Sequence, residues 1–154
     1  MASLTLQRLN WLEKFLRASD KLAARWGRGA SRPRHLETGR KGEEAAYFYL
    51  RRLGYTVVAR GWRTGKLHGD LDLVAWEGSA LCFVEVKTRG SRQVATAESA
   101  VDEEKCKVLR RMARQYLRQL PVPPEETRFD VLSIYTEGGE AAEFELFRGA
   151  FDWY

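Results

Sequence analysis

One stretch of the chain, residues 69–89, constrains the fold more than any other because it predicts a β-hairpin. Its sequence, GDLDLVAWEGSALCFVEVKTR, holds two runs rich in leucine, valine and aromatic residues on either side of Gly78-Ser79. A two-residue loop with glycine first suits a type II′ turn, whose twist matches that of the strands it joins. This turn places Glu77 opposite Ala80 and so fixes the register of the whole hairpin.

Four charged side chains fall on one face of this hairpin. Side chains alternate between the faces of a strand, so the register places Asp72 opposite Glu85. Asp70 faces Lys87 two residues further along. Like charges that face each other destabilise a sheet, and a divalent cation bound between Asp72 and Glu85 would remove that cost. Ligands that are all oxygen favour Mg²⁺ or Mn²⁺. The alternative is the solvated face of an edge hairpin, and the spacing alone favours neither.

The rest of the chain predicts a mixed α/β fold, a sheet flanked by helices. The helical spacing of apolar residues predicts helices over 40–53 and 98–119. Runs of β-branched and aromatic residues bounded by glycine or proline predict strands. The predicted strands span residues 55–60, 70–76, 81–88, 128–135 and 143–147. A helix, three strands, a helix and two strands are typical of an α/β domain.

A carboxylate also interrupts the apolar face of the first predicted helix. At about 100° per residue, Glu43 falls within the stripe formed by Ala46, Tyr47 and Leu50, whereas Glu44 points to solvent. A buried carboxylate is costly unless it is paired or bound to a metal, which makes Glu43 a candidate third ligand. The alternative is a first-turn residue that the helix dipole favours and that still reaches water.

Charge is distributed unevenly along the 154 residues. Residues 1–36 carry eight Lys or Arg against two Asp or Glu, and residues 120–154 carry two against eight. The formal charge of +5 therefore comes from the earlier part of the chain, which can attract phosphate backbones. No apolar run approaches the length of a membrane span. Two cysteines without a CxxC pair suit a reducing cytoplasm.

Residues 1–36 are predicted to form a basic arm that is separate from an α/β domain over 37–154. Residues 4–26 have the apolar spacing of an amphipathic helix, and the glycines and proline of 27–33 suit a linker. The helix could dock on its own domain, form a homodimer contact, lie on an anionic membrane or add a basic arm for DNA. Docking or dimerisation is the preferred interpretation because the apolar stripe needs a cover.

Four parts of the sequence together resemble the YraN family of bacterial proteins. They are GRKGEEAAYFYLRRLGY, HGDLDLVAWEGSALCFVEVKTR, the helix opened by Val101 and Lys105, and RFDVL, and the resemblance extends from about Gly39 to Phe151. That family is similar to the PD-(D/E)xK nuclease superfamily, whose restriction-endonuclease-like fold also serves Holliday-junction resolvases. Where the family usually has glutamate, this chain has Asp70, which is one methylene shorter.

The resemblance implies a nuclease site with a role for each charged residue. Glu43 would be the acid from the leading helix, and Asp72 the metal-binding aspartate. Glu85 and Lys87 would be the paired acid and lysine. The expected ligands of Mg²⁺ or Mn²⁺ are Asp72, Glu85, the Val86 carbonyl and, directly or through water, Glu43.

The expected reaction is hydrolysis of phosphodiester bonds in DNA, with branched or junction DNA among the candidate substrates. Lys87 would orient the attacking water or stabilise the phosphate. The residues expected to bind the substrate are Lys105, Arg89, Thr88 and, as an accessory acid, Asp70. The main rival is a non-catalytic nucleic-acid-binding or adaptor module on the same fold. An enzyme acting on other phosphoesters is a weaker rival, because the chain has no glycine-rich phosphate loop.

Overall fold

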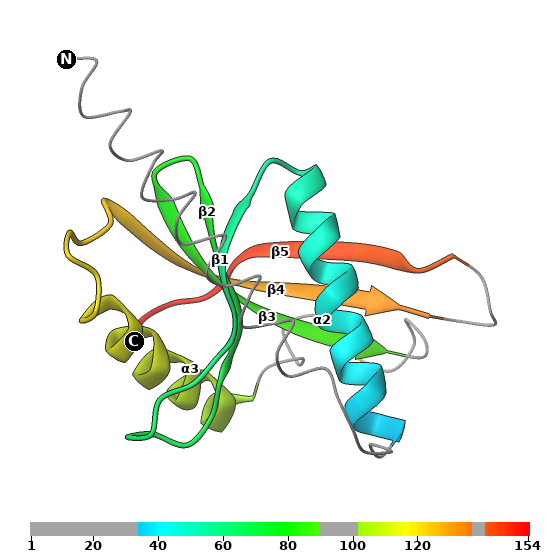
Figure 1. The fold of residues 1–154 in the computed structure, drawn as a ribbon, viewed down its shortest axis with the longest axis horizontal. Helices are drawn as coiled ribbons and strands as arrows, with labels where there is room; N and C mark the ends of the chain where they lie inside the picture. Colours follow the sequence, from blue (N-terminus) through cyan, green and yellow to red (C-terminus); the bar gives the residue numbers. More distant parts are fainter. Residues whose placement is uncertain (1–33, 90–101, 137–140) are drawn as a thin grey trace. The chain divides into compact units, whose positions relative to one another are not determined.

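In the computed structural model of the chain, residues 34–89, 102–136 and 141–154 are described. Helices and strands occupy most of these ranges (Figure 1). They are α2 (Arg34–Arg52), β1 (Thr56–Trp62), β2 (Leu71–Glu77), β3 (Ala80–Arg89), α3 (Glu103–Leu117), β4 (Glu126–Tyr135) and β5 (Glu143–Phe151). The predicted helix over 4–26 and the linker over 27–33 lie outside the described residues.

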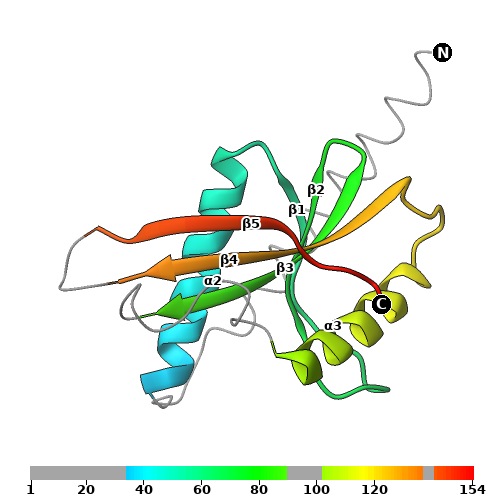
Figure 2. The ribbon, with the colours of Figure 1, turned by 180° about the vertical axis from the view of Figure 1, so that it is seen from behind.

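The strands form a five-stranded mixed sheet in the order β1-β2-β3-β4-β5. Neighbouring strands are antiparallel, except that β3 and β4 are parallel. A parallel pair needs a crossover connection, and α3 lies between β3 and β4 in the sequence. Helix α2 passes in front of the sheet in Figure 1 and behind it in Figure 2, which is seen from the other side. The predicted α/β fold, a mixed sheet flanked by helices, is therefore confirmed.

Because side chains alternate between the two faces of a strand, some buried side chains of the sheet pack on the side of α2 and the others on the side of α3. Leu50 of α2 packs in one cluster with Leu73 and Val84. The neighbouring strand positions point the other way, where Phe83 meets Tyr116 of α3 with ring centroids 6.0 Å apart. Each such side chain contributes roughly 1.5–3 kcal/mol when it is fully buried. The odd-numbered positions of β3, which include its charged residues, therefore face the side of α3.

The hairpin has the register that the turn predicts. Glu77 pairs with Ala80, and the pairs continue to Leu73 and Val84. Gly78 has a φ of +61°, and no non-glycine residue in the described ranges has a positive φ, as a type II′ turn requires. The ladder between β2 and β3 ends at this last pair, directly before the charged residues begin.

The two helices begin at other residues than predicted. Helix α2 starts at Arg34 and runs through Gly39, because a glycine inside a helix costs only about 1 kcal/mol. Helix α3 starts at Glu103, where the Asp102 side chain caps it by accepting a hydrogen bond from Lys105 N at 2.7 Å. The predicted residues 98–101 of this helix lie outside the described part of the chain. No helix among the described residues has the length and apolar character needed to cross a bilayer.

The last strand is longer than predicted. Strand β5 extends to Phe151, which pairs with Phe129 of β4. Their rings stack with centroids 4.6 Å apart. A register shift between Phe129 and Val131 lets the two strands continue past an irregular position. Aromatic contact across the pair thus accounts for the additional residues of β5.

Candidate active site

Glu85 lies at the centre of the candidate site. Its side chain is 3% exposed, and its Oε1 atom is 2.8 Å from Lys87 Nζ and 3.2 Å from Lys105 Nζ. Lys87 follows on β3, whereas Lys105 comes from the first turn of α3. The other oxygen, Oε2, is buried and has no hydrogen-bond partner among the described residues. Such an oxygen is costly to bury unless a cation or a proton accompanies it.

Asp72 reaches the same place from the neighbouring strand. Its Oδ2 atom accepts a hydrogen bond from the Val86 backbone N–H at 2.8 Å. The pKa of Asp72 is raised to about 7, mainly by burial and in the second place by the negative charge of Glu85. The hydrogen bond from Val86 and the positive charge of Lys105 lower this pKa, but they do not outweigh burial and Glu85. Asp72 and Glu85 therefore repel each other, as two carboxylates on one face of a hairpin should.

Glu43 approaches these acids from α2. Its side chain is half-buried, and Glu44 beside it is exposed, as the helical spacing predicts. Burial and then the charge of Asp70 raise the pKa of Glu43, and Glu85 adds to the effect. The charge of Glu43 in turn raises the pKa of Asp72. Acids from the helix and from both strands of the hairpin thus contribute to one negative region.

The helix that carries Glu43 comes close to the end of β3 at Gly42. A Cβ atom on Gly42 would collide with the Thr88 Oγ1 atom of β3. With the Thr88 side chain in this rotamer, the glycine allows α2 to lie close to the end of β3 that carries Lys87. Thr88, which we expected to bind substrate, has its hydroxyl at this contact with the helix.

Asp70 has a different partner from the one that the register suggests. Its Oδ2 atom lies 2.8 Å from Arg63 Nη2, in the connection between β1 and β2. Strand β2 begins only at Leu71, so no ladder holds Asp70 opposite Lys87. Asp70 and Arg63 line a hollow of about 300 Å³. The other residues around this hollow are Thr64, Leu67, His68 and Gly69.

Arg89 and Val86 are the remaining positions that the sequence assigns to the site. The Arg89 Nε atom is buried and has no hydrogen-bond partner in the described part of the chain. The Arg89 carbonyl accepts a hydrogen bond from Thr136 N at 2.9 Å, which ties the end of β3 to the end of β4. Val86 is linked to the site through its N–H, which donates to Asp72.

The acids do not form a closed set of metal ligands. Within the described ranges, no group of three or more His, Cys, Asp or Glu side chains is placed so that it could hold a metal ion. Two lysines contact Glu85 Oε1 instead. The donor types nevertheless fit Mg²⁺ or Mn²⁺, because Asp72 and Glu85 Oε2, which has no partner within the described ranges, supply hard oxygen ligands. The structure thus offers two carboxylates to a divalent cation, with Glu43 within electrostatic range.

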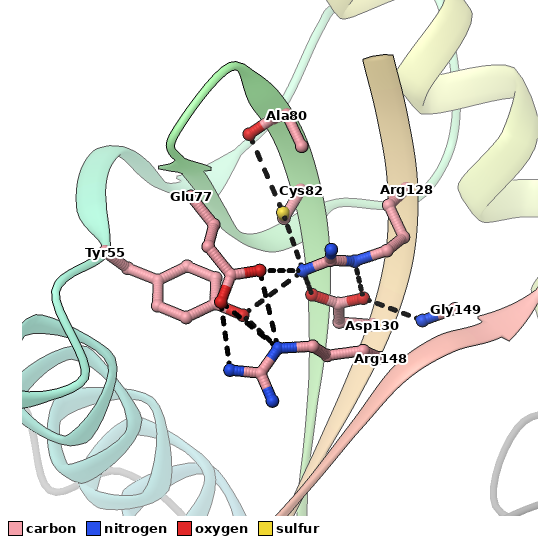
Figure 3. Close-up of polar contacts among 8 residues, drawn as sticks. All are labelled: Tyr55, Glu77, Ala80, Cys82, Arg128, Asp130, Arg148 and Gly149. Atoms are coloured by element: carbon pink, nitrogen blue, oxygen red, sulfur yellow. Dashed lines mark hydrogen bonds and ion pairs between the residues drawn. The ribbon is translucent and has the colours of Figure 1, made fainter.

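A second polar cluster lies on the α2 face of the sheet, and sequence reasoning missed it (Figure 3). Arg128 of β4 is held between Glu77 of β2, at 2.6 Å, and the fully buried Asp130, at 2.7 Å. Arg148 of β5 reaches the same Glu77 at 2.9 Å. The Tyr55 hydroxyl accepts a hydrogen bond from each arginine. The cluster therefore joins β2, β4 and β5 to the residue that precedes β1.

The contacts of this second cluster indicate a structural role. Each of its four charged side chains has an oppositely charged partner. Arg128 also lies 3.3 Å from Cys82 Sγ, but burial raises the pKa of Cys82 to about 12, so the thiol is not ionised at neutral pH. The signal in the sequence was the string RFD, in which Arg128 and Asp130 share one face of a strand.

The fold and the acidic site define an α/β protein whose mixed sheet is consistent with the restriction-endonuclease-like superfamily. Residues 42–134 match the model of a family described as uncharacterised protein family UPF0102. A UPF0102 protein of Koribacter versatilis is 50% identical over 119 residues, which cover 77% of this chain and 82% of that protein. A UPF0102 protein of Solibacter usitatus is 45% identical over 136 residues, which cover 88% of this chain and 96% of that protein.

The chain therefore belongs to the UPF0102 family, also called the YraN family, and the resemblance drawn from its sequence is confirmed. The match begins at Gly42 and ends at Ile134, so it includes Glu43 with the part of α2 that follows it, and both strands of the acidic hairpin. Membership of this family leaves the chemistry to be argued from the site.

Proposed function

We propose that the protein is a metal-dependent nuclease that hydrolyses phosphodiester bonds in DNA. The observation that carries the proposal is the state of Glu85, a buried carboxylate with two lysines on one oxygen and no partner among the described residues on the other. Asp72 lies beside it, and its pKa is raised to about 7 by burial and by Glu85. A divalent cation would satisfy both carboxylates at once.

Mg²⁺ or Mn²⁺ would be held by Asp72 and by Glu85 Oε2. The Val86 carbonyl and Glu43, directly or through water, are the further ligands that we propose. When bound, such an ion supplies Lewis-acid activation of water and neutralises charge on the phosphate. Burial of Glu85 strengthens these electrostatic effects, because charges interact more strongly where water is excluded.

Lys87 has a suitable position to orient the nucleophile. Its ammonium group is 2.8 Å from Glu85 Oε1, yet the side chain is 30% exposed and can reach a bound substrate. An ammonium group donates hydrogen bonds, so it can hold the oxygen of an attacking water next to the acids. It also offsets the negative charge that develops on the phosphate oxygens during the reaction.

Nucleic acid is the substrate class that the charges favour. Arg63 lines the hollow beside Asp70, and the charge of Arg60 lowers the raised pKa of Glu43. With Lys105, these residues place positive groups of β1, of the connection that follows β1 and of α3 around the acids. Such groups position phosphates without reading the base sequence, so branched as well as linear DNA should be tested.

A non-catalytic nucleic-acid-binding or adaptor module is the second candidate function. The observation that favours it is that Lys87 and Lys105 already neutralise Glu85. The lack of a closed set of metal ligands in the described residues points the same way. Such a module would bind DNA with the salt dependence of phosphate contacts and would need no metal ion.

Cleavage of labelled junction, flap, duplex and single-stranded DNA in the presence of Mn²⁺ tests the proposal. We expect Asp72→Asn and Glu85→Gln each to lower the cleavage rate by about 100-fold or more. Glu104→Gln is the matched control, because Glu104 is an exposed acid on α3, and it should cleave like the wild type. Full cleavage by purified Glu85→Gln would refute the proposed site. Metal-independent DNA binding by the wild type, without cleavage of any substrate, would support the second candidate.

A further inference from the structure

We propose that Lys105 is a positioning residue of this site, which holds Glu85 in place and whose charge weakens the binding of the divalent cation. The inference rests on the proposed function, because it concerns the same two carboxylates. It gives Lys105 a direct part in setting the metal affinity, in place of the contact with substrate that the sequence suggested.

Lys105 and Lys87 share one oxygen of Glu85. Their Nζ atoms lie 3.2 and 2.8 Å from Oε1, and Oε2 has no hydrogen-bond partner among the described residues. The two lysines therefore fix which oxygen of Glu85 is left for a metal ion. Lys87 is tied to β3 itself, so Lys105 is the restraint that comes from a separate element.

The backbone of Lys105 is fixed within a packed helix. Its N–H donates to the capping carboxylate of Asp102 at 2.7 Å, and the following residues Cys106 and Leu109 are buried. Moving α3 away from the sheet would uncover these residues. The Lys105 side chain, which is 30% exposed, therefore reaches Glu85 from a helix that is itself packed in place.

Several negative charges surround the Lys105 ammonium group. Besides Glu85, the negative charges of Asp72 and Asp70 also act on its ammonium group. A divalent cation at the same carboxylates would lie within a few ångströms of this ammonium, and like charges at that distance repel strongly in a partly buried site. Removal of the charge, with the length of the side chain kept, should therefore raise the affinity for metal.

Lys107 provides a matched control on the same helix. Its Nζ atom pairs with Glu104 at 2.8 Å, and its side chain is 54% exposed. Lys107→Met removes one positive charge from the protein, as Lys105→Met does, but the charge that it removes belongs to an exposed surface pair. Its effect on metal binding should be small, because solvent and salt screen exposed charges.

Calorimetric titration of the full-length, metal-free protein with Mn²⁺ tests the inference. We expect Lys105→Met to bind Mn²⁺ about tenfold more tightly than the wild type, and Lys105→Arg, which keeps the charge, to remain close to the wild type. Lys107→Met should stay within about twofold. DNA cleavage by Lys105→Met should fall even though metal binding is tighter, because Glu85 has lost one of its two restraints.

The possible outcomes separate this inference from the proposed function. If Asp72→Asn abolishes Mn²⁺ binding but Lys105→Met binds Mn²⁺ no more tightly than the wild type, the inference is overturned and the proposed function stands. If neither the wild type nor Lys105→Met binds Mn²⁺, both are overturned. Thermal unfolding followed by circular dichroism identifies a variant that does not fold, and Lys105→Gln then takes the place of Lys105→Met.

Discussion

The Asp72 carboxylate accepts a hydrogen bond from the Val86 N–H at 2.8 Å, beyond the point where β2 and β3 stop pairing. A side chain thus takes the backbone donor that a longer ladder would have used. The bond ties Asp72 to the residue that follows Glu85. Regular pairing between β2 and β3 therefore ends directly before Asp72 and Glu85.

The raised pKa of Asp72 predicts that the metal-free protein becomes less stable as the pH rises. Burial and Glu85 raise this pKa from its ordinary value of about 4 to about 7, so the native state holds a proton more tightly than the unfolded chain. The resulting stabilisation is fully present below about pH 4 and is lost as the pH rises through about 7. Between about pH 5 and about pH 8, the free energy of unfolding should fall by roughly 2 kcal/mol in urea titrations.

Asp72→Asn is the control for this pH dependence. The variant has no carboxylate to ionise at this position, so its stability should fall much less over the same pH range. Saturating Mn²⁺ at about pH 8 should restore the stability of the wild type and leave the variant unchanged, since a ligand stabilises the state that binds it. Equal pH profiles for the two proteins would show that Asp72 is not responsible.

Glu77 should show the opposite pH dependence. Burial alone would raise its pKa, but hydrogen bonds from Arg148 and Arg128 outweigh burial and lower the pKa to about 2. The stabilisation is therefore present above the ordinary value of about 4.5 and is lost as the pH falls towards about 2. Near neutral pH, Glu77→Gln should lower the free energy of unfolding by about 1–3 kcal/mol.

The difference between Glu77→Gln and the wild type should shrink in acid, as measured by urea unfolding at a series of pH values. Glu104→Gln, whose parent side chain is 83% exposed, should be as stable as the wild type throughout. A constant deficit for Glu77→Gln down to about pH 2 would mean that its ionisation does not stabilise the fold.

Gly42→Ala should push α2 away from β3 and misplace Glu43. The added Cβ would collide with Thr88 Oγ1, so we expect a loss of about 1–3 kcal/mol in stability together with slower cleavage. Gly39→Ala is the matched control, since nothing lies within 4 Å of a Cβ at that helical position, and it should be neutral or slightly stabilising.

Thr88→Ala should rescue Gly42→Ala, because it removes the oxygen that collides. A double-mutant cycle on the free energy of unfolding measures this coupling. Additive effects of the two substitutions would argue against the contact as the reason for glycine at position 42.

The hairpin was predictable from the sequence because its determinants are local. Gly78 selects the turn, and strict alternation then places Asp72 and Glu85 on one face, so the register could be counted from the turn and is confirmed. The position of Glu43 on the inner side of its helix was likewise a matter of helical spacing. Its partial burial follows from the same spacing.

Contacts between distant segments were not predictable in this way. The ion pair of Glu85 with Lys105 joins β3 to α3, and Glu77 meets Arg128 across 51 residues of sequence. Nothing in the local pattern of either partner specifies the other. Asp70 pairs with Arg63 and not with Lys87 because β2 begins only at Leu71. A sequence pattern predicts such a boundary only to within a residue or two.

Anomalous diffraction from crystals soaked in Mn²⁺ tests the metal site most directly. Our account predicts an anomalous peak between the Asp72 carboxylate and Glu85 Oε2. It also predicts that Lys87 and Lys105 keep their contacts with Glu85 Oε1, which leaves Oε2 to the metal ion. If no peak lies at these carboxylates in saturating Mn²⁺, the claim that these acids bind a metal ion is contradicted.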